Sequence, residues 1–196
     1  MSSKSKAILL TVSMGLIKLV CETYSLLNVD RIGRRPLLMV GSLGLTASLL
    51  AIGGSMQLKL AAATPGVTAA SIGVFVGIVG YMAFHALSYG PITWLVLAEI
   101  FPSNIRGKAM GIATMVNRGT SFVVAYTFLT MCERLEWSGT FYLYAAMAAA
   151  SFMFYGLFVP ETAGVRLEEI APLFGDPKAL VRRNLGALRA MVARSK

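Results

Sequence analysis

The feature that most constrains this chain is the spacing of its charged residues. Residues 36–58, 60–98, 119–132 and 137–160 contain no Asp, Glu, Lys or Arg. A transmembrane helix needs about 20 mainly apolar residues to cross roughly 30 Å of hydrocarbon. A water-soluble core does not require several uninterrupted runs of this length, and only 14% of the chain is charged, against about a quarter in soluble domains. The pattern predicts an all-α transmembrane protein with several spans.

Five membrane-spanning helices are expected, at about residues 7–29, 37–57, 68–98, 108–131 and 140–159. The third is too long for one straight crossing, because a helix of that length extends about 46 Å at about 1.5 Å per residue. Gly90 and Pro91 interrupt it. Since proline lacks a backbone donor and clashes with the carbonyl group four residues earlier, a break is expected there.

The basic residues indicate an orientation. Twelve of the 18 Lys and Arg residues fall in residues 30–36, in residues 99–108 or beyond the last span. Because cytoplasmic loops are enriched in Lys and Arg, the N-terminus is expected outside and the C-terminus in the cytoplasm. The net charge of +9 therefore belongs to membrane loops and the tail, and nucleic-acid binding is not expected.

Residues 176–196 form a basic tail with two open interpretations. Asp176 followed by Pro177 is typical of a helix start. Apolar residues then recur at helical spacing, at Val181, Leu185, Leu188 and Val192. One interpretation is an amphipathic helix lying on an anionic cytoplasmic leaflet. The other is a partly disordered basic tail.

Three motifs lie at the predicted span boundaries. They are Asp30-Arg31-Ile32-Gly33-Arg34-Arg35-Pro36, then Gly90-Pro91-Ile92-Thr93-Trp94 with Glu99-Ile100-Phe101-Pro102-Ser103-Asn104-Ile105-Arg106-Gly107, and finally Pro160-Glu161-Thr162-Ala163-Gly164. Together, and in this order, they resemble the sugar-porter signatures of the major facilitator superfamily. Met115-Val116-Asn117-Arg118 and Phe141-Tyr142-Leu143 are most similar to the plant-type polyol and monosaccharide branch.

The resemblance implies that residues 1–175 correspond to helices 8–12 of a twelve-helix transporter, a truncated C-terminal bundle without helices 1–7. The implied function of a full-length protein is transport of a monosaccharide or polyol by alternating access, with proton symport. The implied location is a membrane, with the plasma membrane favoured over the vacuolar membrane. The alternative is a fragment that transports nothing, or a membrane interaction protein.

Five residues are expected to bind substrate. Trp94, with Gly90 and Pro91, matches the family's G-P-x-x-W motif beside the sugar cavity, and Asn117 matches an asparagine near the sugar. His85 is the one histidine and lies within a span, where ionisable residues are functional by default. The alternative for Asn117 is a structural role, in which its side chain hydrogen-bonds to a neighbouring helix. An equally open alternative for His85 is a structural residue whose hydrogen bonds are made within the bundle.

Seven charged residues are expected, by resemblance, to form an intracellular gate of ion pairs: Asp30, Arg31, Arg34, Arg35, Glu99, Arg106 and Glu161. Such a network is a bistable contact whose loss shifts a conformational population. The alternative is a set of solvated loop charges, each worth little.

Three further charges lie inside spans. Lys18 and Glu22 are four residues apart, so on a helix they share a face and are expected to pair. Arg118 needs a partner that the sequence does not identify. One histidine and no C-x-x-C motif leave no ligand set for a metal, so no cofactor is expected. The sequence has no nucleophile triad or phosphate-binding loop, and an enzyme is not expected.

Overall fold

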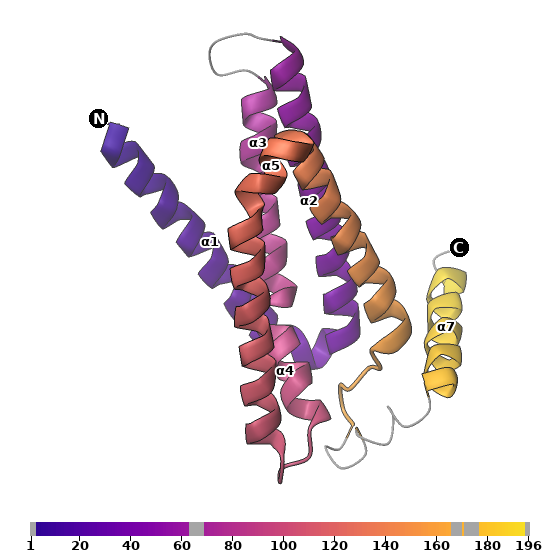
Figure 1. The fold of residues 1–196 in the computed structure, drawn as a ribbon. Coiled ribbons are helices and arrows are strands. Elements are labelled where there is room, and N and C mark those ends of the chain that lie inside the picture. The colour runs from indigo at the N-terminus through magenta and orange to yellow at the C-terminus, as the bar shows by residue number, and fades with distance from the viewer. Residues whose placement is uncertain (1–2, 63–68, 166–169, 171–176, 195–196) are drawn as a thin grey trace.

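The structure, a computed structural model, describes residues 3–62, 69–165, 170 and 177–194, and the regular elements within these ranges are all helical. The elements are α1 (Ser3–Ile32), α2 (Arg34–Ala62), α3 (Ala69–Phe84), the π-helix η1 (His85–Tyr89), α4 (Pro91–Ile100), α5 (Arg106–Phe158) and α7 (Pro177–Arg194). Figure 1 shows the long helices spanning the height of the molecule, with α7 beside its lower part. The predicted all-α class is confirmed.

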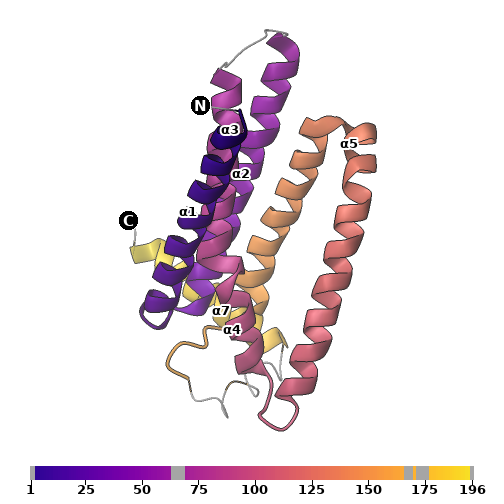
Figure 2. The same ribbon diagram turned by 90° about the vertical axis from the view of Figure 1, so that its left-hand side faces the viewer.

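Within the described part of the chain, four helical stretches are long and apolar enough to span a membrane: Thr11–Ile32, Arg34–Leu58, Ala69–Ile100 and Arg106–Phe158. The last has 53 residues, which at about 1.5 Å per residue is far longer than the hydrocarbon thickness of about 30 Å. Figures 1 and 2 show that α5 turns back on itself, and the backbone of Glu136 leaves helical geometry there, at φ 59° and ψ 167°.

The two arms of α5 therefore take the places of the expected fourth and fifth spans. The first arm (residues 106–135) and the second arm (residues 137–158) lie on either side of Glu136. Helical geometry continues through Glu133 and Arg134, beyond the apolar run, and both residues are exposed. One residue reverses the chain where a loop of about eight residues was expected.

The expected third span is interrupted at the middle of its length. The helix α3 ends at Phe84, five residues follow in π-helical geometry, and α4 begins with Pro91 as its first residue. Proline is tolerated at this position because the first N–H groups of a helix have no partner within it. Ser25 of α1 donates from Oγ to the carbonyl oxygen of Leu87 at 2.6 Å, which fixes the π-helix against α1.

The helices α2 and α3 approach closely because glycine lines their contact. A Cβ atom at Gly77 would lie 2.6 Å from Cγ1 of Ile52, and one at Gly73 would meet the hydroxyl of Ser55. Small residues spaced by four let helix backbones pack closely in membranes.

The three charged segments identified in the sequence lie at one end of the bundle. The connection from α1 to α2, the connection from α4 to α5 and the segment after α5 all occur at the lower end in Figure 1, whereas the turn at Glu136 lies toward the opposite end. A small core packs beside the charged end, made of Val29, Leu37, Leu38, Ile92, Val96 and Val159. Large apolar side chains elsewhere remain exposed, for example Leu27 at 75% and Tyr126 at 78%, as expected of surfaces that face lipid or other helices.

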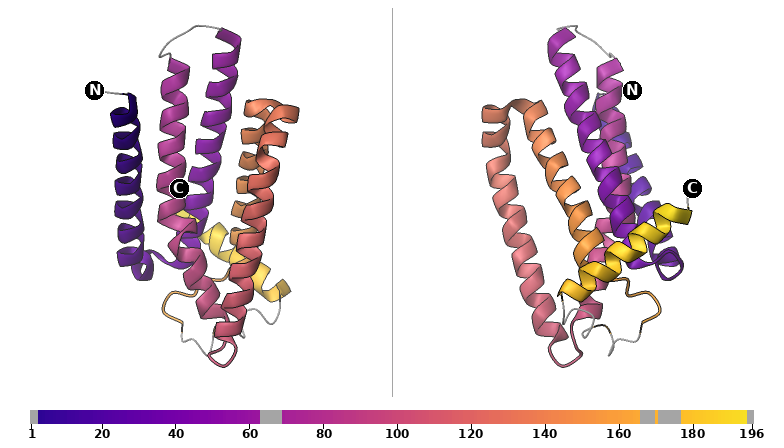
Figure 3. Two further views of the ribbon diagram at one scale, coloured as in Figure 1. Left: turned by 60° about the vertical axis from the view of Figure 1, so that its left-hand side comes forward. Right: turned by 90° about the vertical axis from the view of Figure 1, so that its right-hand side faces the viewer.

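The tail is helical from Pro177 to Arg194, and Figure 3 shows it crossing obliquely beside the lower part of α2 and α5. Its buried residues are Leu180 and Asn184, whereas Leu185 of the predicted apolar stripe is 40% exposed. The face that packs on the bundle is therefore adjacent to the predicted stripe. Leu188 and Val192, also part of that stripe, lie outside the residues whose side chains the structure describes.

Candidate functional site

A cavity of about 690 Å³ lies between α1, the η1–α4 stretch and α5. Its lining includes polar and charged side chains together with aromatic ones. The lining residues are Lys18, Glu22, Leu26, His85, Tyr89, Gly90, Pro91, Thr93, Trp94, Leu97, Ala113, Asn117, Arg118, Ser121 and Tyr155. This surface is called the polar cavity below.

The polar cavity brings together all five residues expected to bind substrate and all three expected intramembrane charges. They come from three separate segments of the chain: α1, the η1–α4 stretch and the first arm of α5. The break at Gly90 sets the position of Trp94, because α4 starts anew there with its own direction. The arrangement supplies charged groups, an amide and an indole facing one space.

Asn117 has a free side-chain amide among the described residues, whereas its polar neighbours bond to their own helix. Ser121 donates from Oγ to the carbonyl oxygen of Asn117 at 2.8 Å, and Thr114 donates to the carbonyl oxygen of Met110 at 2.8 Å. The amide of Asn117 has two donors and one acceptor available for a ligand.

Lys18 and Glu22 approach each other as their spacing predicts. Nζ of Lys18 lies 3.7 Å from Oε1 of Glu22, and the two side chains are 49% and 37% exposed. The distance exceeds that of a hydrogen-bonded pair, so the contact is open and both groups reach the cavity. Arg118 is exposed on the first arm of α5 and makes no ion pair with any residue that the structure describes.

His85 lies in a column of aromatic rings. Its ring centroid is 6.1 Å from that of Tyr81 and 6.3 Å from that of Tyr89, with interplanar angles of 29° and 27°. The hydroxyl of Tyr89 lies 3.1 Å from Oγ of Ser42, and the ring of Tyr155 meets Tyr89 edge-on at 5.6 Å. His85 thus contributes to one wall of the polar cavity from a packed aromatic cluster.

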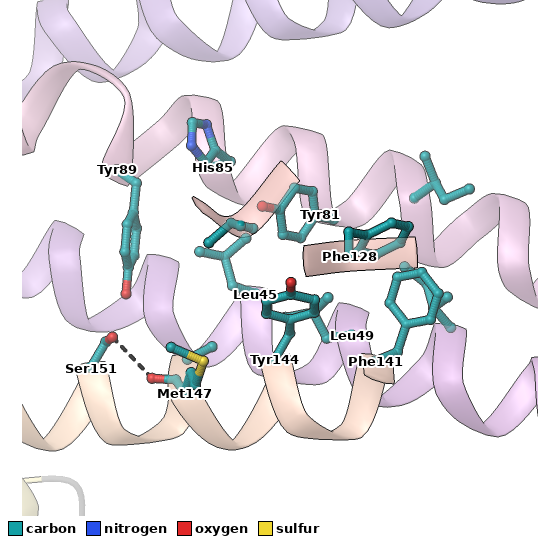
Figure 4. Close-up of a pocket in the computed structure, with 14 residues that line it drawn as sticks. Leu45, Leu49, Tyr81, His85, Tyr89, Phe128, Phe141, Tyr144, Met147 and Ser151 are labelled. Carbon is teal, nitrogen blue, oxygen red and sulfur yellow. Dashed lines mark hydrogen bonds between the residues drawn. The ribbon is translucent and has the colours of Figure 1, made fainter. Parts of the chain in front are cut away.

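A second, mainly apolar cavity of about 510 Å³ lies on the other side of this cluster, between α2, α3, η1 and α5. Figure 4 shows the rings of Tyr81, Phe128, Phe141 and Tyr144 gathered around it, with Leu45 and Leu49 on the facing helix. Apart from Phe141, which belongs to a segment noted for its family resemblance, these aromatic residues were not singled out from the sequence, because aromatic residues are common in the apolar runs of packed spans.

Arg34, at the start of α2, is the centre of a charged network. Its Nε and Nη2 atoms donate to Oε1 of Glu99 at 3.2 Å and 3.0 Å. Its Nη1 atom lies 2.8 Å from Oδ1 of Asp30, although this contact lacks the geometry of a hydrogen bond. The hydroxyl of Thr162 donates to the other oxygen of Glu99 at 2.7 Å. The side chains of Arg34 and Glu99 are only 10% and 12% exposed.

Glu161 joins the network through the backbone. Its Oε1 atom accepts from the N–H groups of Arg34 at 2.9 Å and of Ala163 at 3.0 Å, and its Oε2 atom accepts from the N–H group of Arg35 at 3.2 Å. The carboxylate therefore caps the N-terminus of α2, where free donors and the helix dipole favour a negative charge. Gly33 turns the chain beside it at φ 96°, and a Cβ atom there would lie 2.5 Å from Oε2 of Glu161.

Arg35 connects α2 to the end of α5 and to the middle of α7. Its Nη2 atom donates to the carbonyl oxygen of Gly156 at 2.6 Å and to that of Asn184 at 3.3 Å. The side-chain amide of Asn184 donates to the carbonyl oxygens of Leu157 at 2.9 Å and Val159 at 3.2 Å. Asn184 thus satisfies carbonyl groups at the C-terminal end of α5 that lack a partner within the helix.

Two of the expected gate residues lie outside this network. Arg106 donates from Nε to the carbonyl oxygen of Phe101 at 3.1 Å and so closes the loop before α5. Arg31 is exposed, and its side chain makes no hydrogen bond or ion pair with the described residues. Thr162 and Asn184 belong to the network but were not predicted. Thr162 could have been predicted, because it follows Glu161 in one of the three motifs. No feature of the sequence indicated a role for Asn184.

A bundle of long apolar helices around a polar cavity, with charged contacts gathered at one end, defines the chain as a multi-pass integral membrane protein. The family model described as "Sugar (and other) transporter" matches residues 1–174. The chain belongs to this sugar transporter family of the major facilitator superfamily, so the sugar-porter resemblance is confirmed.

The relatives are transporters. The chain is 37% identical over 187 residues to putative polyol transporter 2 of Arabidopsis thaliana, covering 94% of this chain and 36% of the relative. It is 32% identical over 180 residues to the D-xylose-proton symporter of Escherichia coli (strain K12), covering 88% of this chain and 35% of the relative. The chain therefore spans about a third of the length of these curated relatives.

Solved structures show the same fold. The inward-open conformation of the xylose transporter from E. coli matches with a TM-score of 0.72 at 32% identity, over 86% of this chain and 36% of that one. A proton:xylose symporter of the major facilitator superfamily, bound to 6-bromo-6-deoxy-D-glucose, matches with a TM-score of 0.76 at 30% identity, over 88% of this chain and 36% of that one.

Proposed function

We propose that the 196 residues form the C-terminal helical bundle of a transporter that carries a polyol or monosaccharide across the membrane with protons. The observation that carries the proposal is the polar cavity, which collects Trp94, Asn117 and His85 in its lining. The sequence similarity to a polyol transporter and to a xylose-proton symporter supports the substrate class and the coupling ion.

The chemistry of the cavity suits a neutral polyhydroxylated ligand. The indole of Trp94 offers an apolar face for the C–H surface of such a molecule, and the amide of Asn117 offers donors and an acceptor for its hydroxyl groups. Ligand sites typically combine apolar contact with a few well-placed polar groups. Gly90 and Pro91 contribute by starting α4 at the level of the cavity.

The mechanism we propose is alternating access, in which two helical bundles rock around a site near the middle of the membrane. The charged network at Arg34, Glu99 and Glu161 acts as the gate on the cytoplasmic side, together with Asp30 and Arg35. Arg31 and Arg106 complete this gate by contacts with the opposing bundle. Breaking such contacts shifts the population toward the state that opens on that side.

The orientation that agrees with this mechanism places the charged end in the cytoplasm and the N-terminus outside. The basic tail then lies on the cytoplasmic side, where the exposed Arg182 and Arg183 face an anionic leaflet. We propose the plasma membrane as the location.

Substrate binding is testable with tryptophan fluorescence because the chain has two tryptophans, and only Trp94 lines the polar cavity. In a Trp137→Phe variant, sorbitol, inositol or glucose is expected to change the emission of Trp94 saturably. Asn117→Ala in that background is expected to abolish the change.

The matched control is Trp94→Phe, which leaves Trp137 near the α5 turn as the reporter. Its emission is expected to stay constant at every ligand concentration. A constant emission from Trp94 with all three ligands would contradict the proposed site and favour a chain that pairs with other membrane proteins without binding sugar itself.

A further inference from the structure

Glu22 is distinctive among the carboxylates of the described chain. It lies in the middle of the span Thr11–Ile32 and lines the polar cavity. The other described carboxylates belong to the charged end or to the region of the Glu136 turn. An ionisable group within a membrane is costly and marks a functional site or a transport pathway, and the gate and the polyol contacts proposed above make no use of this one.

The Glu22 carboxylate lies between Lys18 and the start of α4. Its Oε1 atom lies 3.7 Å from Nζ of Lys18, and it would lie 3.3 Å from a Cβ atom at Gly90. The absence of a side chain at residue 90 leaves room for the carboxylate beside the start of α4.

The charged and titratable groups around Glu22 come from α1, η1 and α5. They are Lys18 of α1, His85 and Tyr89 of η1, and Arg118 and Tyr155 of α5, whereas the cavity residues of α4 are neutral. One carboxylate therefore shares the cavity with two basic side chains. Protonation of Glu22 raises the cavity's charge by one and removes the partner of Lys18.

Freeing Lys18 has a consequence for a ligand. An ammonium group has three donors and no acceptor, so while Glu22 is ionised, the two groups attract each other. When the carboxyl group is neutral, this attraction is lost, and the ammonium group of Lys18 can move toward the hydroxyl oxygens of a polyol. Proton binding at Glu22 and polyol binding beside Lys18 then favour each other, and such coupling is reciprocal.

We propose that Glu22 is the proton-binding group of this bundle: it accepts a proton from the outer solution, releases Lys18 to the substrate, and returns the proton on the inner side. The inference rests on the proposed transport function. An O–H bond of hydronium in the outer solution breaks as the O–H bond of the carboxyl group forms, and on the inner side the carboxyl O–H bond breaks as water takes up the proton.

The test separates exchange of substrate from its accumulation. Proteoliposomes containing the chain are loaded with sorbitol, and exchange with radiolabelled sorbitol is measured at equal pH on both sides over a series of pH values. Accumulation is measured with an inward proton gradient. The wild type is expected to exchange sorbitol with a half-saturating concentration that falls as pH falls, and to accumulate it.

Glu22→Gln is expected to exchange sorbitol independently of pH and to lose accumulation, because a neutral amide holds the cavity permanently in its proton-loaded charge state. Lys18→Met is expected to move the pH dependence of exchange to higher pH, since removing the neighbouring cation makes the carboxylate bind its proton more readily. Glu133→Gln, an exposed carboxylate at the far end of the first arm, is the matched control and should behave as wild type.

If Glu22→Gln accumulates sorbitol at the wild-type level, the inference is overturned. If, in addition, a His85→Gln variant loses accumulation, the proton-binding group is His85. In either case wild-type exchange still supports the transport function. A wild-type chain that shows no exchange at any pH would instead overturn the proposed function and the inference with it. If Glu22→Gln does not fold, Lys18→Met decides: an unchanged pH dependence counts against the inference.

Discussion

At the scale of single residues, Arg34 forms two ion pairs that differ in exposure to solvent. Its partner Glu99 is 12% exposed, whereas its partner Asp30 is 80% exposed. Removing one member of a shielded pair leaves an uncompensated charge and costs about 3–5 kcal/mol. An exposed pair is worth about 0–1 kcal/mol. The shielded pair with Glu99 and the exposed pair with Asp30 can therefore be compared on the same guanidinium group.

Glu99→Ala is expected to lower the free energy of unfolding by about 3 kcal/mol, and Asp30→Ala by no more than about 1 kcal/mol. Both are measured by chemical unfolding of the purified chain in the same detergent. Equal losses in the two variants would show that Arg34 is not held by Glu99 in the way described.

Gly33 and Gly164 both have positive φ angles, 96° and 74°, but different surroundings. A non-glycine residue in this region costs about 1–2 kcal/mol. Gly164→Ala is expected to show only this cost, because nothing lies within 4 Å of its added methyl group. Gly33→Ala is expected to cost more, because the methyl group displaces the carboxylate of Glu161 from the start of α2. Thermal unfolding of both variants measures the difference, and an equal effect would contradict the capping role of Glu161.

Residues in recognisable motifs were predictable, and those defined by tertiary contacts were not. The sequence identified Arg34, Glu99 and Glu161, but not that Glu161 would bind backbone N–H groups in place of guanidinium groups. That detail depends on the distance between the segment after α5 and the start of α2. Asn184 was missed because an asparagine in a basic tail resembles a solvated residue until α5 presents its carbonyl groups to it.

At the scale of the elements, two residues of α7 have clear roles in its packing on the bundle. Leu180 is buried, and Asn184 bonds to the end of α5 while its carbonyl group accepts from Arg35. The same contacts join the tail to the charged network.

Asn184→Ala is expected to loosen α7, because two carbonyl groups of α5 lose their donor at a cost of about 1–3 kcal/mol. Amide hydrogen exchange along residues 177–194 should become faster, with little change in α2 and α3. Arg182→Ala, which changes an exposed residue of the same helix, is the control and should leave exchange as in the wild type. Unchanged protection of α7 in Asn184→Ala would contradict this attachment.

The elements themselves were largely predictable, because apolar runs bounded by charges identify helices of membrane length. The break at Gly90 and Pro91 was also predictable, but two other irregularities were not. The π-helix at His85–Tyr89 has no signal in composition, since its register depends on the contact of Ser25 with Leu87. The turn at Glu136 was expected as a loop, because charged residues usually mark where a span ends, whereas here both arms continue into the charged segment.

At the scale of the whole molecule, the chain combines a cavity at mid-height with a charged network at one end. The break between η1 and α4 links them, since α4 begins at the cavity with Gly90 and ends at the network with Glu99. Movement of α4 therefore affects both. We expect ligand binding beside Trp94 and the state of the Arg34–Glu99 pair to be coupled in the proposed transporter.

The most direct measurement is the concentration dependence of radiolabelled sorbitol uptake into proteoliposomes that contain the chain, compared with empty vesicles and with Asn117→Ala. Saturable uptake that Asn117→Ala abolishes, and that Glu133→Gln leaves intact, is the predicted result. Uptake that rises linearly and equals that of empty vesicles, for sorbitol, inositol and glucose alike, would contradict transport by this polypeptide.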